Sequence, residues 1–457
     1  MVLTLHLRVC APYKKRNSGS APKYTNRNHP PPRLGTEVFA ALHRLANQEI
    51  ENQYLSMPFP TIAVIREEKN PPDARVPLTP PQVAALRNRG VDIVVQPSEG
   101  RTFKDHEYAD LGVPVVEDIT DRELLLGVKE VPVDKLMPGK AYCFFAHVAK
   151  EQPYNQKLMR AFLEKGITHI DYEYLTDDKG SRLIAFGYWA GMVGAHNAVW
   201  TYAQRTGTFE LPRLNTLHDY AAAKEVYATL SLPPLRVVLT GTGRVGTGAA
   251  RVLEDIGLEK VSPEDFLKGK GSTVFTQLHV RDYAQHPSGQ PIDKYHFYQH
   301  SEEYQSAFGP YAKVADIFVN GIFWDGKAPA FFTKEEMNTD EFNIKVIGDV
   351  TCDIAPAASV PSTLFASTIA NPVFGYDPET GDIVAPYSDY AVDVMSIDNL
   401  PSELPRDAST AFGATFIEKI LPEFELKNSD ILRRASITIN GELGPDFQHL
   451  REYAGLE

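Results

Sequence analysis

Two short segments of the sequence end an apolar run with a basic side chain. GVKEVP places Lys129 in this position, and CFFAHVAK places His147 there, with Lys150 close behind. If both runs are strands of a parallel sheet, their carboxyl ends face the ligand crevice, which makes these side chains site candidates. Histidine exchanges protons near neutral pH, and lysine does so when burial or neighbouring cations lower its pKa, by up to about 3–5 units. Such a pair could move protons on nitrogen, and on an attacking water, while a C–N bond is oxidised or reduced.

Each member of this pair also has an ordinary structural interpretation. A lysine that ends a strand is often a solvated edge charge, and a lone histidine is often a hydrogen-bonded structural residue. Their joint occurrence on adjacent predicted strands favours the functional interpretation.

Four further charged residues could hold a substrate. Arg75 in DARVPLTP and Arg182 in DKGSRLIAFG can each fork onto a carboxylate, as an amino-diacid substrate would require. Glu130 and Glu173 could balance the lysines or bind a substrate ammonium group. Surface arginines and structural ion pairs remain the alternatives for these four.

A glycine-rich loop follows an apolar strand in VVLTGTGRVGTGAARVL. Gly241, Gly243 and Gly246 form the spacing G-x-G-x-x-G directly before a predicted helix. Glycines at these positions allow a tight turn, close approach of the backbone to pyrophosphate and close packing of helix on strand, while the helix N-terminus favours the anion. The context predicts a dinucleotide site, and the alternative is a glycine-rich turn without a ligand.

The sequence leaves the choice between NAD and NADP open. An NAD enzyme usually carries Asp or Glu about twenty residues after this loop, where it binds the ribose hydroxyls. Here Ser262 occupies roughly that place, with Glu264 and Asp265 just beyond it. The loop residue Arg244 could contact the additional phosphate of NADP or could be a solvated residue.

The elements that must position these residues read as strands alternating with helices. Such alternation predicts an α/β fold with parallel sheets, here two Rossmann-like domains. A long helix rich in small residues, WAGMVGAHNAVWTYAQR, would link the two domains. Residues 258–312 read as an insertion. The expected domains are an extension over 1–60, a discontinuous catalytic domain of 61–187 plus 401–457, and a dinucleotide-binding domain of 188–400.

Composition excludes two classes of partner. The 457 residues include 59 Asp and Glu against 46 Lys and Arg, a formal net charge of −13. Nucleic acid and anionic membranes attract basic surfaces, so neither is an expected partner. No stretch approaches the roughly 18–20 apolar residues that cross a bilayer. Small molecules are the expected partners, and the oligomeric state is not specified.

Cysteine usage and the N-terminus bear on the compartment. Cys10, Cys143 and Cys352 are too few and too scattered for a disulfide framework or a zinc site, so no metal is expected. They fit a reducing compartment such as the cytoplasm. Residues 1–36 are basic and contain no Asp or Glu, which is typical either of an organellar leader or of a disordered extension.

Several segments together resemble the alanine dehydrogenase/transhydrogenase superfamily and, within it, the lysine-forming saccharopine dehydrogenases. The opening IREEKNPPDARVPLTP is similar to the N-terminal signature of the superfamily. The resemblance covers roughly residues 61–425 in colinear order. The segments closest to the saccharopine dehydrogenases are LLGVKEVP, FFAHVAKEQPYN, IDYEYLTDDKGSRLIAFGYWAGMVGAHN, VLTGTGRVGTGA, VNGIFWDGKAP, GDVTCDIAP and SIDNLPSELPRDAS.

The resemblance implies roles for the charged residues of the first expected domain. Lys129 falls on the acid–base lysine of the family, and His147 falls on its partner histidine. Glu130 and Glu173 align with acidic groups that tune the lysine.

The resemblance also implies an interdomain active-site cleft, between the two α/β domains, and the residues that bind there. Arg75 and Arg182 align with arginines that bind substrate carboxylates. Asp398 aligns with an aspartate near the nicotinamide end of the cofactor, and Asp349 and Asp353 lie in a motif that lines the same cleft.

The sequence departs from the family pattern at two places. Val245 follows the loop arginine where the fungal enzyme carries a cysteine, so disulfide control at this position is not expected. Residues 258–312 have no counterpart in the short fungal form, which leaves the adenosine pocket undefined.

The expected activity is an NAD- or NADP-dependent interconversion of saccharopine and water with lysine and 2-oxoglutarate. One alternative is oxidative deamination of a smaller amino acid, as in alanine dehydrogenase. The other is a sensor that binds the dinucleotide without catalysis.

Overall fold

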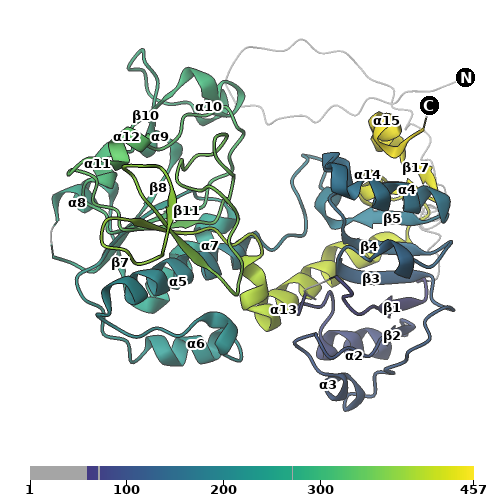
Figure 1. The fold of residues 1–457 in the computed structure, drawn as a ribbon. Helices are drawn as coiled ribbons and strands as arrows, with labels where there is room; N and C mark the ends of the chain where they lie inside the picture. The colour runs from purple at the N-terminus through teal and green to yellow at the C-terminus, as the bar shows by residue number, and fades with distance from the viewer. Residues whose placement is uncertain (1–58, 70–72, 270, 457) are drawn as a thin grey trace, which may run out of the picture. The chain divides into compact units, whose positions relative to one another are not determined.

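Two β-sheets organise the part of the chain that the structure describes. This part comprises residues 59–69, 73–269 and 271–456 of a computed structural model (Figure 1). The expected extension over residues 1–60 therefore lies outside the described residues except for its last two. Residues 56–457 form one compact unit that contains both sheets, and the division of this unit into domains remains a prediction.

The first sheet has seven strands in the order β17-β16-β5-β4-β3-β1-β2. Its five strands from the N-terminal half pair in parallel, and the two strands from the chain end add in antiparallel fashion beside β5. Figure 1 shows the yellow C-terminal strand β17 near the blue strand β5. The strands are β1 (Ile62–Val64), β2 (Ile93–Val95), β3 (Leu124–Lys129), β4 (Ala141–Phe145), β5 (Thr168–Asp171), β16 (Ser436–Ile439) and β17 (Glu442–Leu443).

The second sheet has eight strands in the order β14-β13-β15-β12-β11-β6-β8-β7. All neighbours pair in parallel except at β13 and β14. A separate antiparallel pair is formed by β9 (Ala284–Gln285) and β10 (Gln305–Ser306). The strands of the large sheet are β6 (Arg236–Thr240), β7 (Glu259–Lys260), β8 (Val274–Leu278), β11 (Ile317–Asn320), β12 (Val346–Asp349), β13 (Val373–Tyr376), β14 (Ile383–Val384) and β15 (Val392–Met395).

The α-helices include the predicted long helix, which is α5. The α/β class predicted from the alternation of elements is confirmed, with two largely parallel sheets. The helices are α2 (Pro80–Asn88), α3 (Asp105–Ala109), α4 (Gln156–Glu164), α5 (Gly187–Thr206), α6 (Tyr220–Tyr227), α7 (Arg244–Ile256), α8 (Pro263–Lys268), α9 (Val280–Tyr283), α10 (Lys294–Gln299), α11 (Gly309–Ala312), α12 (Lys334–Met337), α13 (Pro405–Thr415), α14 (Asp430–Ala435) and α15 (Arg451–Ala454).

Small residues on α5 explain how it packs against α7. A Cβ added to Gly191 of α5 would lie 1.9 Å from the carbonyl oxygen of Val245, and one added to Gly248 of α7 would lie 1.9 Å from that of Tyr188. The two helix backbones are therefore too close for any side chain at these glycines. The approach holds the start of α7, and with it the glycine-rich loop, against the long helix.

Strand β8 corrects one expectation about the cofactor pocket. The strand beside β6 is β8, and Thr240 pairs with Leu278 at the end of both strands. Ser262, which lies roughly where the acid of an NAD enzyme was expected, follows the edge strand β7 and caps α8 by accepting the backbone N–H of Asp265 at 3.1 Å. The expectation was wrong because α8 and a loop lie between Ser262 and the strand beside β6. The segment 258–312 is thus only partly an insertion, since it contains a central strand of the sheet.

Candidate active site

One large cleft joins the residues that the sequence singled out. Its volume is about 1430 Å³, above the roughly 300–1,000 Å³ of a pocket for one small ligand. The space therefore suits a dinucleotide together with a second molecule. The predicted site residues that line it are Arg75, Lys129, His147, Lys150, Glu173, Arg182, Gly241, Gly243, Arg244, Val245, Asp353 and Asp398.

Lys129 ends β3 at an irregularity in the sheet. Leu126 pairs with Cys143, but Lys129 pairs with Phe145, so three steps on β3 match two on β4. This bulge re-aims the end of the strand. Burial and the nearby Arg75 lower the pKa of the Lys129 ammonium. Within the described residues, its Nζ makes no hydrogen bond or ion pair, which leaves it available to a ligand in the cleft.

His147 lies beside Lys129 at the end of the next strand. Its backbone is left-handed, with φ of 56°, an uncommon conformation for a residue with a side chain. Burial and the positive charge of Lys150 lower the pKa of His147 to about 4. The imidazole is therefore neutral at pH 7 and can accept a proton from a bound molecule.

Glu173 sits between two cations at the edge of the cleft. Its Oε1 lies 3.2 Å from Nζ of Lys150 and 2.7 Å from Nη2 of Arg182. Burial alone would raise the pKa of Glu173, but Lys150, Arg182 and His147 outweigh it and lower the pKa. The carboxylate stays ionised and orders the two cations, both of which still line the cleft.

Arg75 is held by partners that the sequence did not identify. Its Nε and Nη2 donate to the two carboxylate oxygens of Asp73 at 2.9 and 2.6 Å, and Nη2 also donates to Oδ1 of Asn399 at 2.8 Å. The guanidinium lies 4.2 Å from the ring centre of Phe186. Within the described residues, Nη1 has no hydrogen-bond partner, so one edge of this buried cation remains for a ligand carboxylate.

Three predicted site residues, Glu130, Gly246 and Asp349, do not line the cleft. Glu130 pairs with Lys69 at 2.6 Å. Asp349 is buried, accepts hydrogen bonds from Asn320 and Thr363 at 2.9 and 2.7 Å, and accepts the N–H of Cys352 at 3.2 Å. Asp349 thus anchors the loop that carries Asp353 into the cleft.

The glycine-rich loop has the geometry of a dinucleotide cradle. Gly241 has φ of +95°, and a Cβ there would lie 2.4 Å from the carbonyl oxygen of Gly321. A Cβ on Gly246 would lie 2.0 Å from the carbonyl oxygen of Gly241, whereas one on Gly243 would meet no protein atom within 4 Å. The first and third glycines are required by the protein itself. The second faces open space at the N-terminus of α7, where backbone N–H groups can bind pyrophosphate.

The end of β8 supplies basic rather than acidic side chains. His279 and Arg281 follow Leu278 and line the cleft. The carboxylate of Asp282 accepts the backbone N–H of His279 at 2.8 Å and is not among the cleft residues. In the described part of the chain, the Arg281 guanidinium forms no ion pair.

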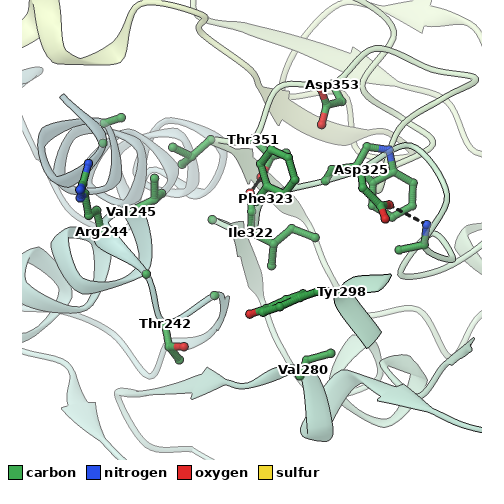
Figure 2. Close-up of a pocket in the computed structure, with 18 of the residues that line it drawn as sticks. Thr242, Arg244, Val245, Val280, Tyr298, Ile322, Phe323, Asp325, Thr351 and Asp353 are labelled. Atoms are coloured by element: carbon green, nitrogen blue, oxygen red, sulfur yellow. Dashed lines mark hydrogen bonds between the residues drawn. The ribbon is translucent and has the colours of Figure 1, made fainter. Parts of the chain in front are cut away.

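Residues from the segment after β8 complete the cleft. Figure 2 shows Tyr298 and Val280 around the same pocket as Thr242 and Val245, with Ile322 near the centre of the view and Phe323 above it. The dashed contact in this view belongs to Asp325, whose Oδ1 accepts two backbone N–H groups, each at 2.9 Å.

Sequence reasoning missed four acidic or amide residues that support the site. Glu67, Asp73, Asp171 and Asn399 hold site residues through hydrogen bonds. Asp73 could have been noticed, because it lies two residues before Arg75 in the signature segment. The other three act on residues more than twenty positions away, and no local pattern marks them.

Neither a metal centre nor a membrane segment is found in the described residues. No group of three or more His, Cys, Asp or Glu side chains there is arranged to hold a metal ion. None of the described helices is long and apolar enough to cross a bilayer.

Comparisons with known proteins agree with the resemblance. Residues 63–193 match the family described as alanine dehydrogenase/PNT, N-terminal domain. The chain is 29% identical over 446 residues to alpha-aminoadipic semialdehyde synthase, mitochondrial, of Rattus norvegicus, which covers 86% of this chain and 48% of the relative. It is 29% identical over 394 residues to the saccharopine dehydrogenase (NAD+, L-lysine-forming) of Emericella nidulans, which covers 82% of this chain and 96% of the relative.

The chain thus spans about half the length of its animal relative and nearly all of the fungal one. Among solved structures, an L-alanine dehydrogenase aligns with a TM-score of 0.58 at 20% identity and covers 86% of this chain and 99% of its own. That likeness supports the fold. The predicted resemblance to lysine-forming saccharopine dehydrogenases within the alanine dehydrogenase superfamily is confirmed.

Proposed function

We propose that this protein interconverts saccharopine, NAD(P)+ and water with L-lysine, 2-oxoglutarate and NAD(P)H. The proposal rests on one observation: Lys129 and His147 lie at the ends of two adjacent strands, in a cleft that the glycine-rich loop also lines. The pKa values of both groups are lowered, which favours their neutral forms. The neutral form of each group is the one that can accept a proton. The similarity along nearly the full length of the fungal saccharopine dehydrogenase supports the same reaction.

The chemistry requires protons to move on nitrogen and oxygen. In the direction of cleavage, a nicotinamide cofactor held at the loop from Gly241 to Gly243 would supply the hydride acceptor, and the carbon attached to the secondary amine is oxidised to give an imine. The resulting imine adds water, and the carbinolamine collapses to the amine of lysine and the ketone of 2-oxoglutarate. A base must accept a proton from the attacking water, and an acid must return one to the departing nitrogen.

Lys129 and His147 suit these two roles. The Lys129 amine has no competing hydrogen bond within the described residues, and the neutral imidazole of His147 can accept a proton. Once protonated, either group becomes the acid that delivers a proton to nitrogen. In the condensation direction the same groups exchange roles, since the forward and reverse reactions share one transition state.

Cations around the cleft suit the carboxylates of a two-armed substrate. Lys150 and Arg182 are ordered by Glu173 at one side, and Arg75 is ordered by Asp73. A cation that is already held in place loses less conformational entropy when a carboxylate binds. The proposed clamps for substrate carboxylates are therefore Arg182, Lys150 and Nη1 of Arg75.

The proposal includes a preference for NADP over NAD. In Rossmann folds, a carboxylate at the end of the strand beside the glycine loop accepts the ribose hydroxyls of NAD. Here His279 and Arg281 follow that strand, and Asp282 is engaged in capping. Basic side chains in this position favour the 2′-phosphate. This preference differs from the NAD+ in the name of the fungal relative.

An assay of NAD(P)H oxidation with purified protein tests the proposal. Rapid oxidation that requires both lysine and 2-oxoglutarate, and that is faster with NADPH than with NADH, is the expected result. Activity with ammonia and pyruvate but none with lysine would instead indicate an alanine-dehydrogenase-like enzyme. Dinucleotide binding without turnover of either amine would indicate a sensor.

A further inference from the structure

Glu67 lies just beyond β1 and reaches the end of β3. Its Oε1 accepts the backbone N–H of Val128 at 2.6 Å, and its Oε2 accepts that of Lys129 at 2.9 Å. These N–H groups lie at the bulge where the pairing of β3 with β4 shifts. A side-chain carboxylate thus accepts both N–H groups where the register is broken.

Asp171 makes the same kind of contact at the end of the next strand. It is the last residue of β5, and its Oδ2 accepts the backbone N–H groups of Ala146 and His147 at 3.1 and 3.3 Å. Its Oδ1 accepts the N–H of Glu173 at 2.9 Å. The chain turns left-handed at His147 directly after β4, so these bonds fix the turn that aims the imidazole.

Both carboxyl groups occupy costly positions. Burial raises the pKa of Glu67 to about 8 and that of Asp171 to about 7, despite the N–H groups that each one accepts. Desolvation of a charged group is unfavourable, so a purely structural contact would not require a carboxyl group here. Glu67 lies close to this part of β3, since a Cβ on Gly127 would lie 3.4 Å from its Oε1, an ordinary van der Waals contact.

We infer that Glu67 and Asp171 are positioning residues for the reaction proposed above, on which this inference rests. Glu67 sets the strand end that carries Lys129, and Asp171 sets the turn that carries His147. Neither carboxyl group is among the residues that line the cleft. Each acts through the backbone of a proton-transferring residue, and together they set the separation and orientation of the pair.

The test uses the full chain with Glu67→Gln and Asp171→Asn. Each substitution keeps the shape but replaces one acceptor oxygen by a donor, which cannot bind a second N–H. The expected result is a fall in kcat of about tenfold to a hundredfold, the range for small misplacements of catalytic groups. The KM for lysine and 2-oxoglutarate and the Kd for the dinucleotide should change less than twofold, and the pH profile of kcat/KM should shift.

A matched control lies at the other end of the same strands. Oε2 of Glu123 accepts the backbone N–H of Thr61 at 2.8 Å, outside the cleft. Glu123→Gln removes a comparable contact and should leave kcat and the pH profile unchanged. A melting temperature that falls in Glu67→Gln while kcat and the pH profile stay at wild-type values would overturn the inference.

A second variant and a second readout keep the test decisive. If Glu67→Gln does not fold, Glu67→Asp keeps both carboxyl oxygens but withdraws them from the two N–H groups by one methylene, and it should lower kcat by several-fold at constant KM. The amide proton of Lys129 should shift upfield by NMR in either variant. If the wild-type protein does not turn over lysine, the proposed function fails, and an unchanged amide shift in Glu67→Gln would separately overturn the positioning role.

Discussion

The carboxyl edge of the first sheet and that of the second meet the cleft with different chemistry. The first presents titratable side chains, Lys129, His147 and Glu173, whose pKa values are shifted by burial and by neighbouring charges. The second presents the loop from Gly241 to Gly243 and the start of α7. At Gly241 and Gly246, nearby backbone carbonyl groups leave no room for a Cβ, whereas Gly243 faces open space.

This contrast separates two demands that an enzyme of this kind must meet. Proton transfer needs side chains whose pKa values depend on desolvation and on neighbouring charges. Recognition of pyrophosphate needs backbone N–H groups at a helix N-terminus, which do not titrate. Variants on the first sheet should therefore change kcat, and variants on the second should change dinucleotide affinity.

The largest expected effect is that of Lys129→Met. Removal of the proton-transferring amine should lower kcat by about 100-fold or more, while the Kd for the dinucleotide stays the same. Steady-state kinetics and isothermal titration calorimetry measure the two quantities. Lys140→Met, at the opposite end of the sheet, is the control and should behave as wild type. An unchanged kcat in Lys129→Met would remove the lysine from the mechanism.

Substitution of the loop glycines should lower the dinucleotide affinity, which Lys129→Met leaves unchanged. In Gly246→Ala the new methyl group overlaps the carbonyl oxygen of Gly241, and overpacking of this kind costs about 1–3 kcal/mol. We expect a lower melting temperature. We also expect the dinucleotide affinity to fall by about tenfold, which corresponds to a loss of about 1.4 kcal/mol of binding free energy.

The matched variant in the same loop is Gly243→Ala. Its methyl group meets no protein atom within 4 Å, so the melting temperature of the free protein should not change. The dinucleotide affinity should still fall, because the methyl group projects into the space proposed for pyrophosphate. Wild-type affinity in Gly243→Ala would show that the ligand does not approach this backbone.

A smaller effect is expected for Arg281→Ser at the end of β8. Loss of this exposed cation should reduce the preference for NADPH over NADH by about fivefold, the effect of roughly 1 kcal/mol at an exposed charge pair. The ratio of kcat/KM for the two cofactors measures it, with Arg89→Ser, at the residue directly after α2, as the control. An unchanged ratio would contradict a 2′-phosphate contact at Arg281.

The smallest expected effect concerns stability and pH. Because burial raises the pKa of Glu67 to about 8, the folded state binds this proton more tightly than the unfolded chain does. The contribution of this proton to stability is complete below the ordinary pKa of about 4.3 and is lost as the pH rises through about 8. In Glu67→Gln this loss should disappear.

Thermal melts at pH 5 and pH 8.5 test the prediction. The drop in melting temperature between the two pH values should be smaller in Glu67→Gln than in wild type by about 2–4 °C, which corresponds to roughly 1 kcal/mol in a domain of 150–250 residues. An equal drop in both proteins would mean that Glu67 does not titrate in this range.

Local patterns predicted much of the fold. The strand before Gly241, the spacing of the three glycines and the helix after them lie within one short segment, so turn chemistry and periodicity suffice to identify them. The same holds for α5 and for the strands that end at Lys129 and near His147. By contrast, the pairing of β16 with β5 joins residues more than 250 positions apart, and β8 follows a helix and a loop that resemble an insertion.

By itself, the sequence determined the α/β class, the dinucleotide loop and the two basic residues at strand ends, because each depends on neighbours within a few positions. The tertiary structure alone decided which groups surround them. Asp73 and Asn399 accept hydrogen bonds from Arg75. Glu67 and Asp171 accept the backbone N–H groups of Lys129 and His147. His279 and Arg281 take the place expected for an acid. Apart from the contact of Asp73 with Arg75, burial and hydrogen bonding between distant segments set these arrangements, and no local pattern encodes them.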